Sequence, residues 1–308
     1  MYFFFGDGEL GNQIFQYKFI EKIIKKKTIL ISTNFKDLDK LITLDKKISL
    51  INFENKYLVF LLRRVLIWVF ILFTKLRLIS SINVSRISLY GNKLEKKKII
   101  IKKGLFNSTF IYPRFFQSEF FFNIKKRINI KPSHLKEAQI FFSGIPPRKK
   151  YVFIHYRQGK SIKEKKMGLF GMSGIGKKDY QIIEFLGMKG LALPDLYYKE
   201  LIKFFIKKLK NPHFIILSDD KNYAKKKFSF LKKKSISKND LFVDLSIMSL
   251  CSYGIMSNSS ISWWGGYLMK KRKILFGPKY WLGWKRKIVF QAGGEPSFAR
   301  LIDPNKFI

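Results

Sequence analysis

Short apolar runs alternate with amphipathic segments throughout the second half of the chain. The apolar runs cover 151–154, 213–217, 254–256 and 274–276, and helical periodicity covers 196–209 and begins again at Lys221 and near Ser260. Strands that alternate with helices predict a parallel α/β sheet. We therefore predict one α/β domain in this half.

The first residues repeat the same order. An apolar run at 2–5 is followed by a glycine turn at 6–12, by a helical pattern with Phe15, Phe19 and Ile23 on one face, and by a β-rich run at 28–31. The segment 132–147 ends in glycine and prolines and predicts a hinge. We therefore predict an α/β fold with two Rossmann-like domains facing a cleft, one at 1–147 and one at 148–308.

The charge balance is strongly basic. The chain has 61 Lys plus Arg against 21 Asp plus Glu, a formal net charge of +40. This excess indicates an anionic partner such as nucleic acid, anionic lipid or a phosphorylated ligand. The alternative is a compositional drift toward Lys, Ile, Asn and Phe, which explains the shortage of acidic residues less readily. With a single cysteine, Cys251, and three histidines, the chain is not a disulfide scaffold, and we expect no metal and no cofactor.

The segment from Tyr57 to Leu76 is strongly apolar but contains Arg63 and Arg64. Its uninterrupted part is about half of the ~20 residues that a membrane-spanning helix needs. It therefore predicts either a helix lying in a membrane interface, with basic flanks on anionic headgroups, or a buried core helix. Because no secretory signal opens the chain, we expect a cytoplasmic protein, peripheral on the inner face of the membrane.

Glycines at 6, 8 and 11 match the dinucleotide-binding fingerprint after a predicted strand. The acidic residue that should end the second strand is missing, since Ser32, Thr33 and Asn34 stand there. Nicotinamide binding is thus one interpretation. The other is a glycine turn in which Gly11 and Asn12, as helix N-cap, approach any ligand in the cleft.

Polar residues follow three of the predicted strands. His155, Arg157 and Gly159 follow the first, and Ser218 and Asp219 follow the second. An arginine there can bind a diphosphate through two charge-assisted hydrogen bonds, and a carboxylate can accept from ribose hydroxyls.

The third strand leads into a hydroxyl-rich helix start. The residues that place hydroxyl, amide and backbone N–H groups there are Asn258, Ser259, Ser260 and Ser262. The positive end of a helix dipole favours phosphate at such a junction. A purely structural cap is the alternative at each of the three strands.

A set of short motifs runs in a fixed order along nearly the whole chain. They are LGNQIFQY at 10–17, FQSE at 116–119, HYR at 155–157, YYK at 197–199, SDD at 218–220, DLSIMSLC at 244–251, NSSISWWG at 258–265 and GPKYW at 277–281. In this order they resemble the α-1,2-fucosyltransferases of glycosyltransferase family 11, most specifically in the two blocks between 244 and 265.

The resemblance implies a GT-B architecture, with an acceptor-side domain at 1–147 and a GDP-sugar-binding domain at 148–308. It implies inverting, metal-independent transfer of fucose from GDP-fucose to a 2-hydroxyl, often of galactose, in surface polysaccharide or lipopolysaccharide synthesis. The acceptor would be a glycan or a lipid-linked oligosaccharide. An anionic membrane surface is an expected partner, and a specific nucleic acid is not.

The resemblance also implies roles for single residues. Arg157 would neutralise the leaving diphosphate, Ser259 and Ser260 would hold it at the helix start, Asp219 would face the nucleoside, and Asn12 would reach the cleft. His155 is the nearest candidate to accept the proton of the acceptor, with Asp7 or Glu9 possible. The donor-binding set implied in this way is Gly11, Arg157, Gly159, Ser218, Asp219, Asn258, Ser259, Ser260 and Ser262.

One motif departs from the family pattern. The family continues Arg-Arg-Gly-Asp-Tyr, whereas 157–161 reads Arg-Gln-Gly-Lys-Ser, with Lys160 in place of the carboxylate. Two alternatives therefore stay open: a catalytically altered GT-B protein that binds anionic membrane or nucleic acid, and a transferase that uses another GDP-sugar.

Overall fold

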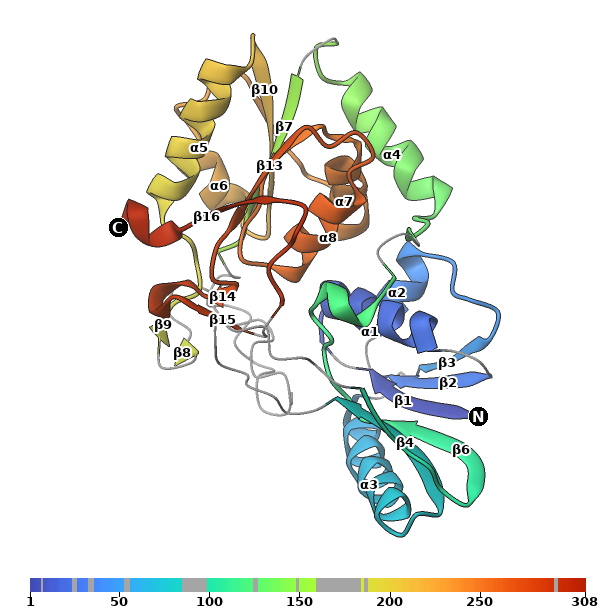
Figure 1. Cartoon of the computed structure of the whole chain (residues 1–308). Helices are drawn as coiled ribbons and strands as arrows, with labels where there is room; N and C mark the ends of the chain where they lie inside the picture. Colours follow the sequence, from blue (N-terminus) through green and yellow to red (C-terminus); the bar gives the residue numbers. More distant parts are fainter. Residues whose placement is uncertain are drawn as a thin grey trace. The chain divides into compact units, whose positions relative to one another are not determined.

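The structure is a computed structural model that describes residues 1–6, 8–23, 27–32, 36–52, 56–84, 99–123, 127–147, 150–158, 184–185, 188–290 and 293–308. The chain divides into two compact units, Met1–Asn129 and Ile130–Ile308 (Figure 1). Each unit is built around a mostly parallel six-stranded sheet. The predicted fold class, α/β with two Rossmann-like domains, is confirmed.

Unit 1 holds a sheet with strand order β3-β2-β1-β6-β4-β5, in which β5 alone is antiparallel to its neighbour. The strands are β1 (Tyr2–Gly6), β2 (Thr28–Ser32), β3 (Ile48–Asn52), β4 (Ile79–Val84), β5 (Ile99–Lys102) and β6 (Phe106–Ile111). The helices are α1 (Leu10–Ile23), α2 (Lys36–Leu41), α3 (Lys56–Lys75) and the 3-10 turn η1 (Glu119–Phe121).

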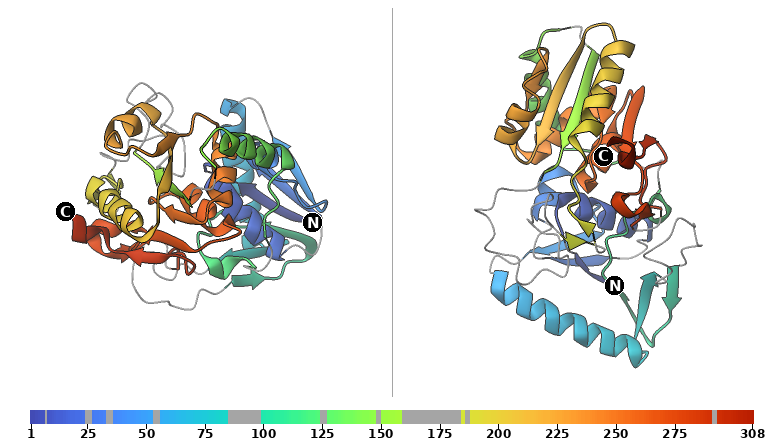
Figure 2. Two further views of the ribbon diagram at one scale, coloured as in Figure 1. Left: turned by 90° about the horizontal axis from the view of Figure 1, so that it is seen from above. Right: turned by 90° about the vertical axis from the view of Figure 1, so that its left-hand side faces the viewer.

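The phenylalanines of β1 explain why this strand is central. Successive side chains of a strand point to opposite faces of the sheet. Phe3 and Phe5 accordingly lie against Phe70 of α3, with ring centroids 4.9 and 5.8 Å away, whereas Phe4 faces Phe116 on the other side. A continuous apolar run therefore marks a strand that is covered on both faces. Figure 2 shows α3 running as one helix along its side of the sheet.

Unit 2 holds a sheet with strand order β11-β10-β7-β12-β13-β16, all parallel. Its strands are β7 (Lys150–Tyr156), β10 (Pro212–Ser218), β11 (Lys234–Ile236), β12 (Tyr253–Ile255), β13 (Ile274–Pro278) and β16 (Arg300–Ile302). Its helices are α4 (Pro132–Ser143), α5 (Asp195–Lys208), α6 (Lys221–Lys227), α7 (Leu241–Leu250) and α8 (Ser260–Leu268). Short elements complete it: β8 (Glu184–Phe185), β9 (Met188–Lys189), β14 (Leu282–Gly283), β15 (Ile288–Val289), η3 (Trp284–Arg286) and η4 (Pro304–Phe307).

The division between the units falls before α4, whereas the sequence prediction placed it at 147/148. Most of the expected hinge, 132–147, is the helix α4 itself. This helix packs against α7, where the rings of His134 and Phe242 stack with centroids 5.3 Å apart. That long-range contact assigns α4 to unit 2.

The apolar segment at 57–76 forms α3. Leu66, Ile67, Phe70 and Ile71 pack on the cluster around Phe5 and Phe110 of the sheet, so one face of the helix belongs to the core. The helix is not a fully buried core helix, because Trp68 and Leu72 are exposed. No helix in the described ranges has both the length and the hydropathy that crossing a membrane requires.

Candidate functional site

The topology of unit 2 brings the candidate residues to one edge of its sheet. From β7 the chain passes to β10 and β11 on one side and then returns to β12, β13 and β16 on the other. The order therefore reverses between β7 and β12, and open α/β sheets bind ligands at such a switch point, beyond the carboxyl ends of the strands. The site residues expected in unit 2 lie at the ends of β7, β10 and β12 or directly after them, at this edge.

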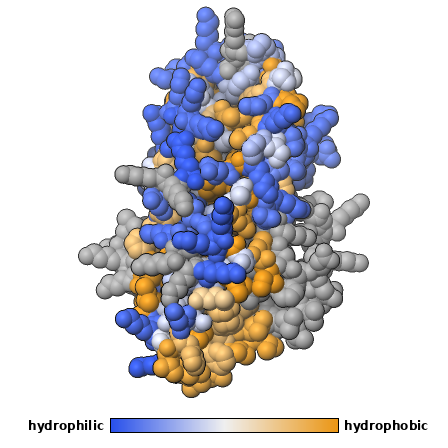
Figure 3. Space-filling model, turned by 90° about the vertical axis from the view of Figure 1, so that its right-hand side faces the viewer, coloured by the Kyte–Doolittle hydropathy of each residue, from blue (hydrophilic) through white to orange (hydrophobic). Residues whose placement is uncertain are grey.

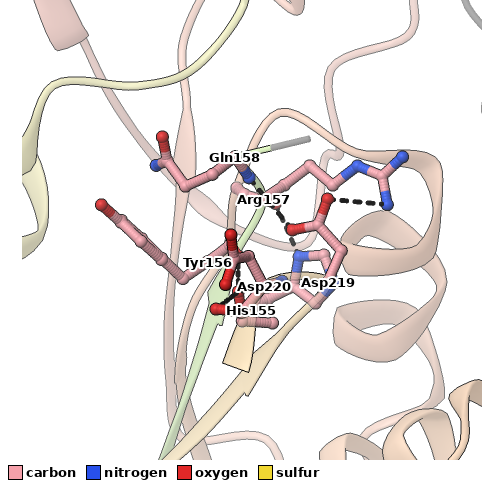
Figure 4. A network of polar contacts seen from close by, with 8 residues as sticks. His155, Tyr156, Arg157, Gln158, Asp219 and Asp220 are labelled. Carbon is pink, nitrogen blue, oxygen red and sulfur yellow. Dashed lines mark hydrogen bonds and ion pairs between the residues drawn. The ribbon is translucent and has the colours of Figure 1, made fainter. Parts of the chain in front are cut away.

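Arg157 follows β7 and is held by Asp219, which follows β10. The Arg157 guanidinium lies 3.3 Å from Asp219 Oδ2, and the backbone N–H of Gln158 donates to Asp219 Oδ1 over 3.1 Å (Figure 4). The Asp219 side chain is 8% exposed and that of Arg157 25%. Both carboxylate oxygens of Asp219 thus have partners within the protein, and Asp219 orients Arg157. This pair was not predicted from the sequence, because Arg157 and Asp219 follow different strands and only the strand order makes them neighbours.

Ser218 and Asp220 stabilise the same edge. The Ser218 hydroxyl donates to the backbone oxygen of Tyr156 over 2.7 Å, which joins the ends of β10 and β7. Asp220 is the N-cap of α6 and accepts from the backbone N–H of Tyr223 over 2.9 Å. Ser218 therefore has a structural role, the connection of two strand ends, in addition to the donor contact that the sequence predicts.

His155 is buried on β7 and contacts the neighbouring strand end. Its Nδ1 lies 2.6 Å from the hydroxyl of Ser257, which follows β12. Burial lowers the pKa of His155 to about 4, since the ring cannot be charged without losing solvation; the positive charge of Arg157 acts in the same direction and Asp219 opposes it. A neutral ring with so low a pKa is a weak base at neutral pH, and it positions Ser257.

The start of α8 carries the hydroxyl-rich segment. Ser259 is its N-cap with φ −143°, but its side chain makes no capping hydrogen bond. Ser262 accepts from the backbone N–H of Ser257 over 3.0 Å and so shapes the turn. Ser259 and the half-buried Ser260 remain at the positive end of the helix, where the first N–H groups have no intrahelical acceptor.

Two glycines let α8 sit close to its neighbours. A Cβ at Gly265 would lie 2.4 Å from the sulfur of Met248 on α7, and one at Gly266 would lie 2.7 Å from Leu275 on β13. The Gly-Gly pair at 265–266 therefore lets α8 pack closely against α7 and β13.

A loop after β13 adds residues that the sequence did not predict as functional. Asn258 Oδ1 accepts from the backbone N–H of Leu282 over 2.8 Å. Tyr280 and Leu282 have left-handed φ values of 60° and 57°, and Glu295 accepts from the N–H of Tyr280 over 2.6 Å. Strained conformations of this kind cost about 1–3 kcal/mol each and cluster at ligand sites.

The side-chain nitrogens Asn258 Nδ2 and Trp281 Nε1 are both buried in this loop region. Neither has a hydrogen-bond partner within the described part of the chain. A buried donor without a partner costs about 1–3 kcal/mol, so each requires an explanation. In the sequence, only the GPKYW motif indicated a role for Trp281. No local pattern predicted that Trp281 lies in the same region as Asn258.

Unit 1 has a polar pair at the equivalent edge of its own sheet. Its order reverses between β1 and β6, and Asn12 and Gln117 follow these strands. Gln117 Nε2 donates to Asn12 Oδ1 over 2.5 Å. Gly8 has φ +89°, and a Cβ there would lie 2.9 Å from Asn12 Nδ2, so this turn requires glycine. The sequence singled out Asn12 but not its partner.

The N-cap role predicted for Asn12 is wrong. The helix α1 begins at Leu10, so Asn12 lies inside its first turn, and its backbone N–H donates to the oxygen of Glu9 over 2.8 Å. Gly11 is buried in the same turn. Asp7, Gly159 and Lys160 lie outside the described residues. Among the described residues, no three histidine, cysteine or acidic side chains gather as metal ligands would.

The fold, with two α/β units that are each built around a six-stranded sheet, is of the GT-B type. A solved structure of a glycosyl transferase family 9 protein from Veillonella parvula matches 98% of this chain and 85% of its own length, with a TM-score of 0.51 and 10% identity. At this identity the match concerns the fold alone.

Sequence comparison confirms the resemblance to glycosyltransferase family 11 over one part of the chain. Residues 183–287 match the family model described as Glycosyl transferase family 11. An alpha-1,2-colitosyltransferase from Escherichia coli is 34% identical over 91 residues, 28% of this chain and 31% of the relative. The O-antigen biosynthesis glycosyltransferase WbnK from Escherichia coli is 29% identical over 101 residues, 31% of this chain and 33% of the relative. The matched segments span about a third of the length of these relatives. The family-model match over 183–287 contains β10, α7, α8 and the 279–283 loop.

Proposed function

We propose that this chain is an inverting glycosyltransferase that moves fucose from GDP-fucose to the 2-hydroxyl of a glycan, often of galactose, in the synthesis of surface polysaccharide or lipopolysaccharide. The observation that carries the proposal is Arg157, oriented by Asp219 at the switch-point edge that also bears the start of α8. The family 11 match over 183–287 supports it.

The chemistry needs positive charge at the leaving group. When the sugar–phosphate bond breaks, negative charge grows on the GDP oxygens and the sugar becomes oxocarbenium-like. Arg157 and the N–H groups at the start of α8, with Ser259 and Ser260, stabilise this charge more in the transition state than in the ground state. In this proposal these groups supply the charge compensation, and a metal ion is not required for it.

Trp281 extends the expected donor-binding set, and its neighbour Asn258 is kept in it. Their buried nitrogens are hydrogen-bond donors, which suits the oxygen atoms of a nucleotide sugar. The backbone N–H of Leu282 donates to Asn258 Oδ1, and this bond keeps the loop that carries Trp281 beside Asn258. We assign them to the donor, together with Arg157, Ser259 and Ser260.

His155 acts through Ser257 in this proposal. Its pKa of about 4 and its 2.6 Å contact with the serine suit a neutral ring that fixes the β12–α8 turn. Glu9 is exposed beside the turn that holds Asn12 in unit 1. In this proposal Glu9 accepts the proton of the acceptor hydroxyl. Asn12 and Gln117 are proposed to bind the acceptor sugar.

Calorimetry with GDP tests the donor site. Arg157→Ala should weaken GDP binding by about 1.5–3 kcal/mol, or about 10- to 150-fold, the range for hydrogen bonds to charged groups. Arg300→Ala is the matched control, because Arg300 is exposed on β16, the outermost strand of the same sheet, from which β13 and β12 separate it from β7. Equal affinities of Arg157→Ala and wild type would refute the assignment. No GDP binding by the wild type would favour the catalytically altered alternative.

The donor sugar itself is a separate question. The relative named for colitosyl transfer favours a second candidate, a transferase that uses another GDP-sugar. Release of GDP from GDP-fucose and from GDP-mannose, measured with a galactoside acceptor, compares two donors directly. Turnover with GDP-fucose at less than a tenth of the rate with another GDP-sugar would replace fucose in the proposal.

A further inference from the structure

The helix α3 is apolar on two opposite faces. Leu66, Ile67, Phe70 and Ile71 pack on the sheet of unit 1, and Thr74 on the same face bonds to the hydroxyl of Tyr112 over 2.9 Å. A helix at a protein surface is expected to be polar on its other side. This one is not.

The outward face of α3 is a continuous apolar stripe. Its members share a spacing of three or four residues and are all exposed: Val65, Trp68, Val69, Leu72, Phe73 and Leu76. Trp68 is the most exposed of them, at 66%. At 1.5 Å per residue the stripe is about 17 Å long. Large apolar side chains gathered in this way mark an interaction surface.

The stripe continues onto the β5–β6 region. The backbone N–H of Leu105 donates to the oxygen of Arg77 over 2.8 Å, directly after the end of α3. Leu105 is 78% exposed, and Ile101 and Phe106 are exposed as well. Figure 3 shows apolar residues gathered over this part of unit 1.

The surroundings of the stripe are basic. Lys75, Arg77, Lys102 and Lys103 are exposed beside it. Neither 56–84 nor 99–118 contains an aspartate or a glutamate. The surface therefore combines apolar area with charge of one sign.

We propose that this surface, the outward face of α3 with Leu105, Phe106 and Ile101, binds an anionic phospholipid bilayer with α3 parallel to the membrane plane. Helices that lie in the interface combine an apolar face with flanking Lys and Arg that contact anionic headgroups. Because the inward face of α3 already packs on the sheet, the helix cannot be surrounded by lipid. A second copy of the chain fits less well, since a two-fold contact through this face would bring like charges together.

Trp68 makes the proposal directly measurable. The other tryptophans, Trp263, Trp264, Trp281 and Trp284, are all buried in unit 2. Vesicles of phosphatidylglycerol and phosphatidylcholine with brominated acyl chains should therefore quench mainly Trp68 emission. Binding should fall at least tenfold when phosphatidylglycerol is omitted or when the salt is raised from 0.1 to 0.5 M.

Variants distinguish binding through the outward face of α3 from nonspecific binding to vesicles. Trp68→Glu and Leu72→Glu should each reduce vesicle binding at least tenfold while the melting temperature and GDP binding stay unchanged. Phe230→Glu is the matched control, because Phe230 is an exposed aromatic residue of unit 2. Unchanged binding by both α3 variants, no quenching of the wild type, or a dimer in sedimentation velocity that Trp68→Glu dissociates would each overturn the proposal.

Discussion

Replacing Trp281 with phenylalanine separates ligand binding from stability. The change removes one buried N–H that has no partner within the described residues, which relieves a cost of about 1–3 kcal/mol. It also removes part of a buried ring, which costs about the same. The free energy of unfolding should therefore change by less than about 1 kcal/mol. If Nε1 donates to the diphosphate, GDP binding should weaken by about 1.5–3 kcal/mol, or about 10- to 150-fold.

Trp284 provides the control with the opposite expectation. Its Nε1 donates to the backbone oxygen of Leu191 over 3.3 Å, and its ring is equally buried. Trp284→Phe should lower the free energy of unfolding by about 2–6 kcal/mol, because truncating the ring costs about 1–3 kcal/mol, as at Trp281, and a buried carbonyl that loses its partner costs about as much again. GDP affinity should stay unchanged. Urea unfolding and GDP calorimetry on both variants are the assays. If Trp281→Phe loses stability and retains GDP affinity as Trp284→Phe does, the donor role of Trp281 is refuted.

Three further substitutions test the local geometry. Gly8→Ala should lower the free energy of unfolding by about 1–3 kcal/mol in urea, because φ is +89° and the new Cβ would meet Asn12 and Phe115 at 2.9 Å. Burial raises the pKa of Asp244 to about 7, so the folded protein binds its proton more tightly than the unfolded chain; stability should fall as pH rises from about 4 to 7, and Asp244→Asn should flatten this slope. His155, with its pKa lowered to about 4, should make stability fall as pH drops below about 6.5, and His155→Gln should remove that dependence.

Each of these has a contradicting result. A Gly8→Ala protein as stable as the wild type would mean that the turn can rearrange. A pH slope that persists in Asp244→Asn would assign the titration to another carboxylate. A rate profile whose inflection near pH 6.5 disappears in His155→Gln would restore His155 as a proton acceptor.

The sequence predicted local structure well where the pattern was periodic. The strands β7, β10, β12 and β13 and the start of α8 lie where the apolar runs and the Ser-rich segment indicated. The order of β3 to β6 was not predictable, because their residues carry no clear alternation and their pairing is long-range. The boundary before α4 was likewise hidden, since only the contact with α7 decides it.

The candidate site was predicted residue by residue but not as a network. Arg157 and Asp219 were expected to contact different parts of the donor, yet they contact each other. Ser262 was expected in the donor-binding set, and its oxygen also accepts a hydrogen bond from the backbone N–H of Ser257, which the sequence did not predict. Such pairings depend on which strand ends become neighbours, and a strand order that reverses around β7 cannot be read from motif spacing.

The polar bonds across the strand ends also determine how substitutions should combine. Side chains join β10 to β7 through Ser218 and Asp219, and β7 to β12 through His155. Residues whose contacts converge on one short segment, here 155–158 at the end of β7, show energetic coupling, whereas distant residues contribute independently. Losses measured for Asp219 and Ser257 variants should therefore not add in the double variant, although the two residues lie on different loops. Assigning a share of catalysis to either one requires the full double-mutant cycle, because the three strand ends respond as one cooperative element.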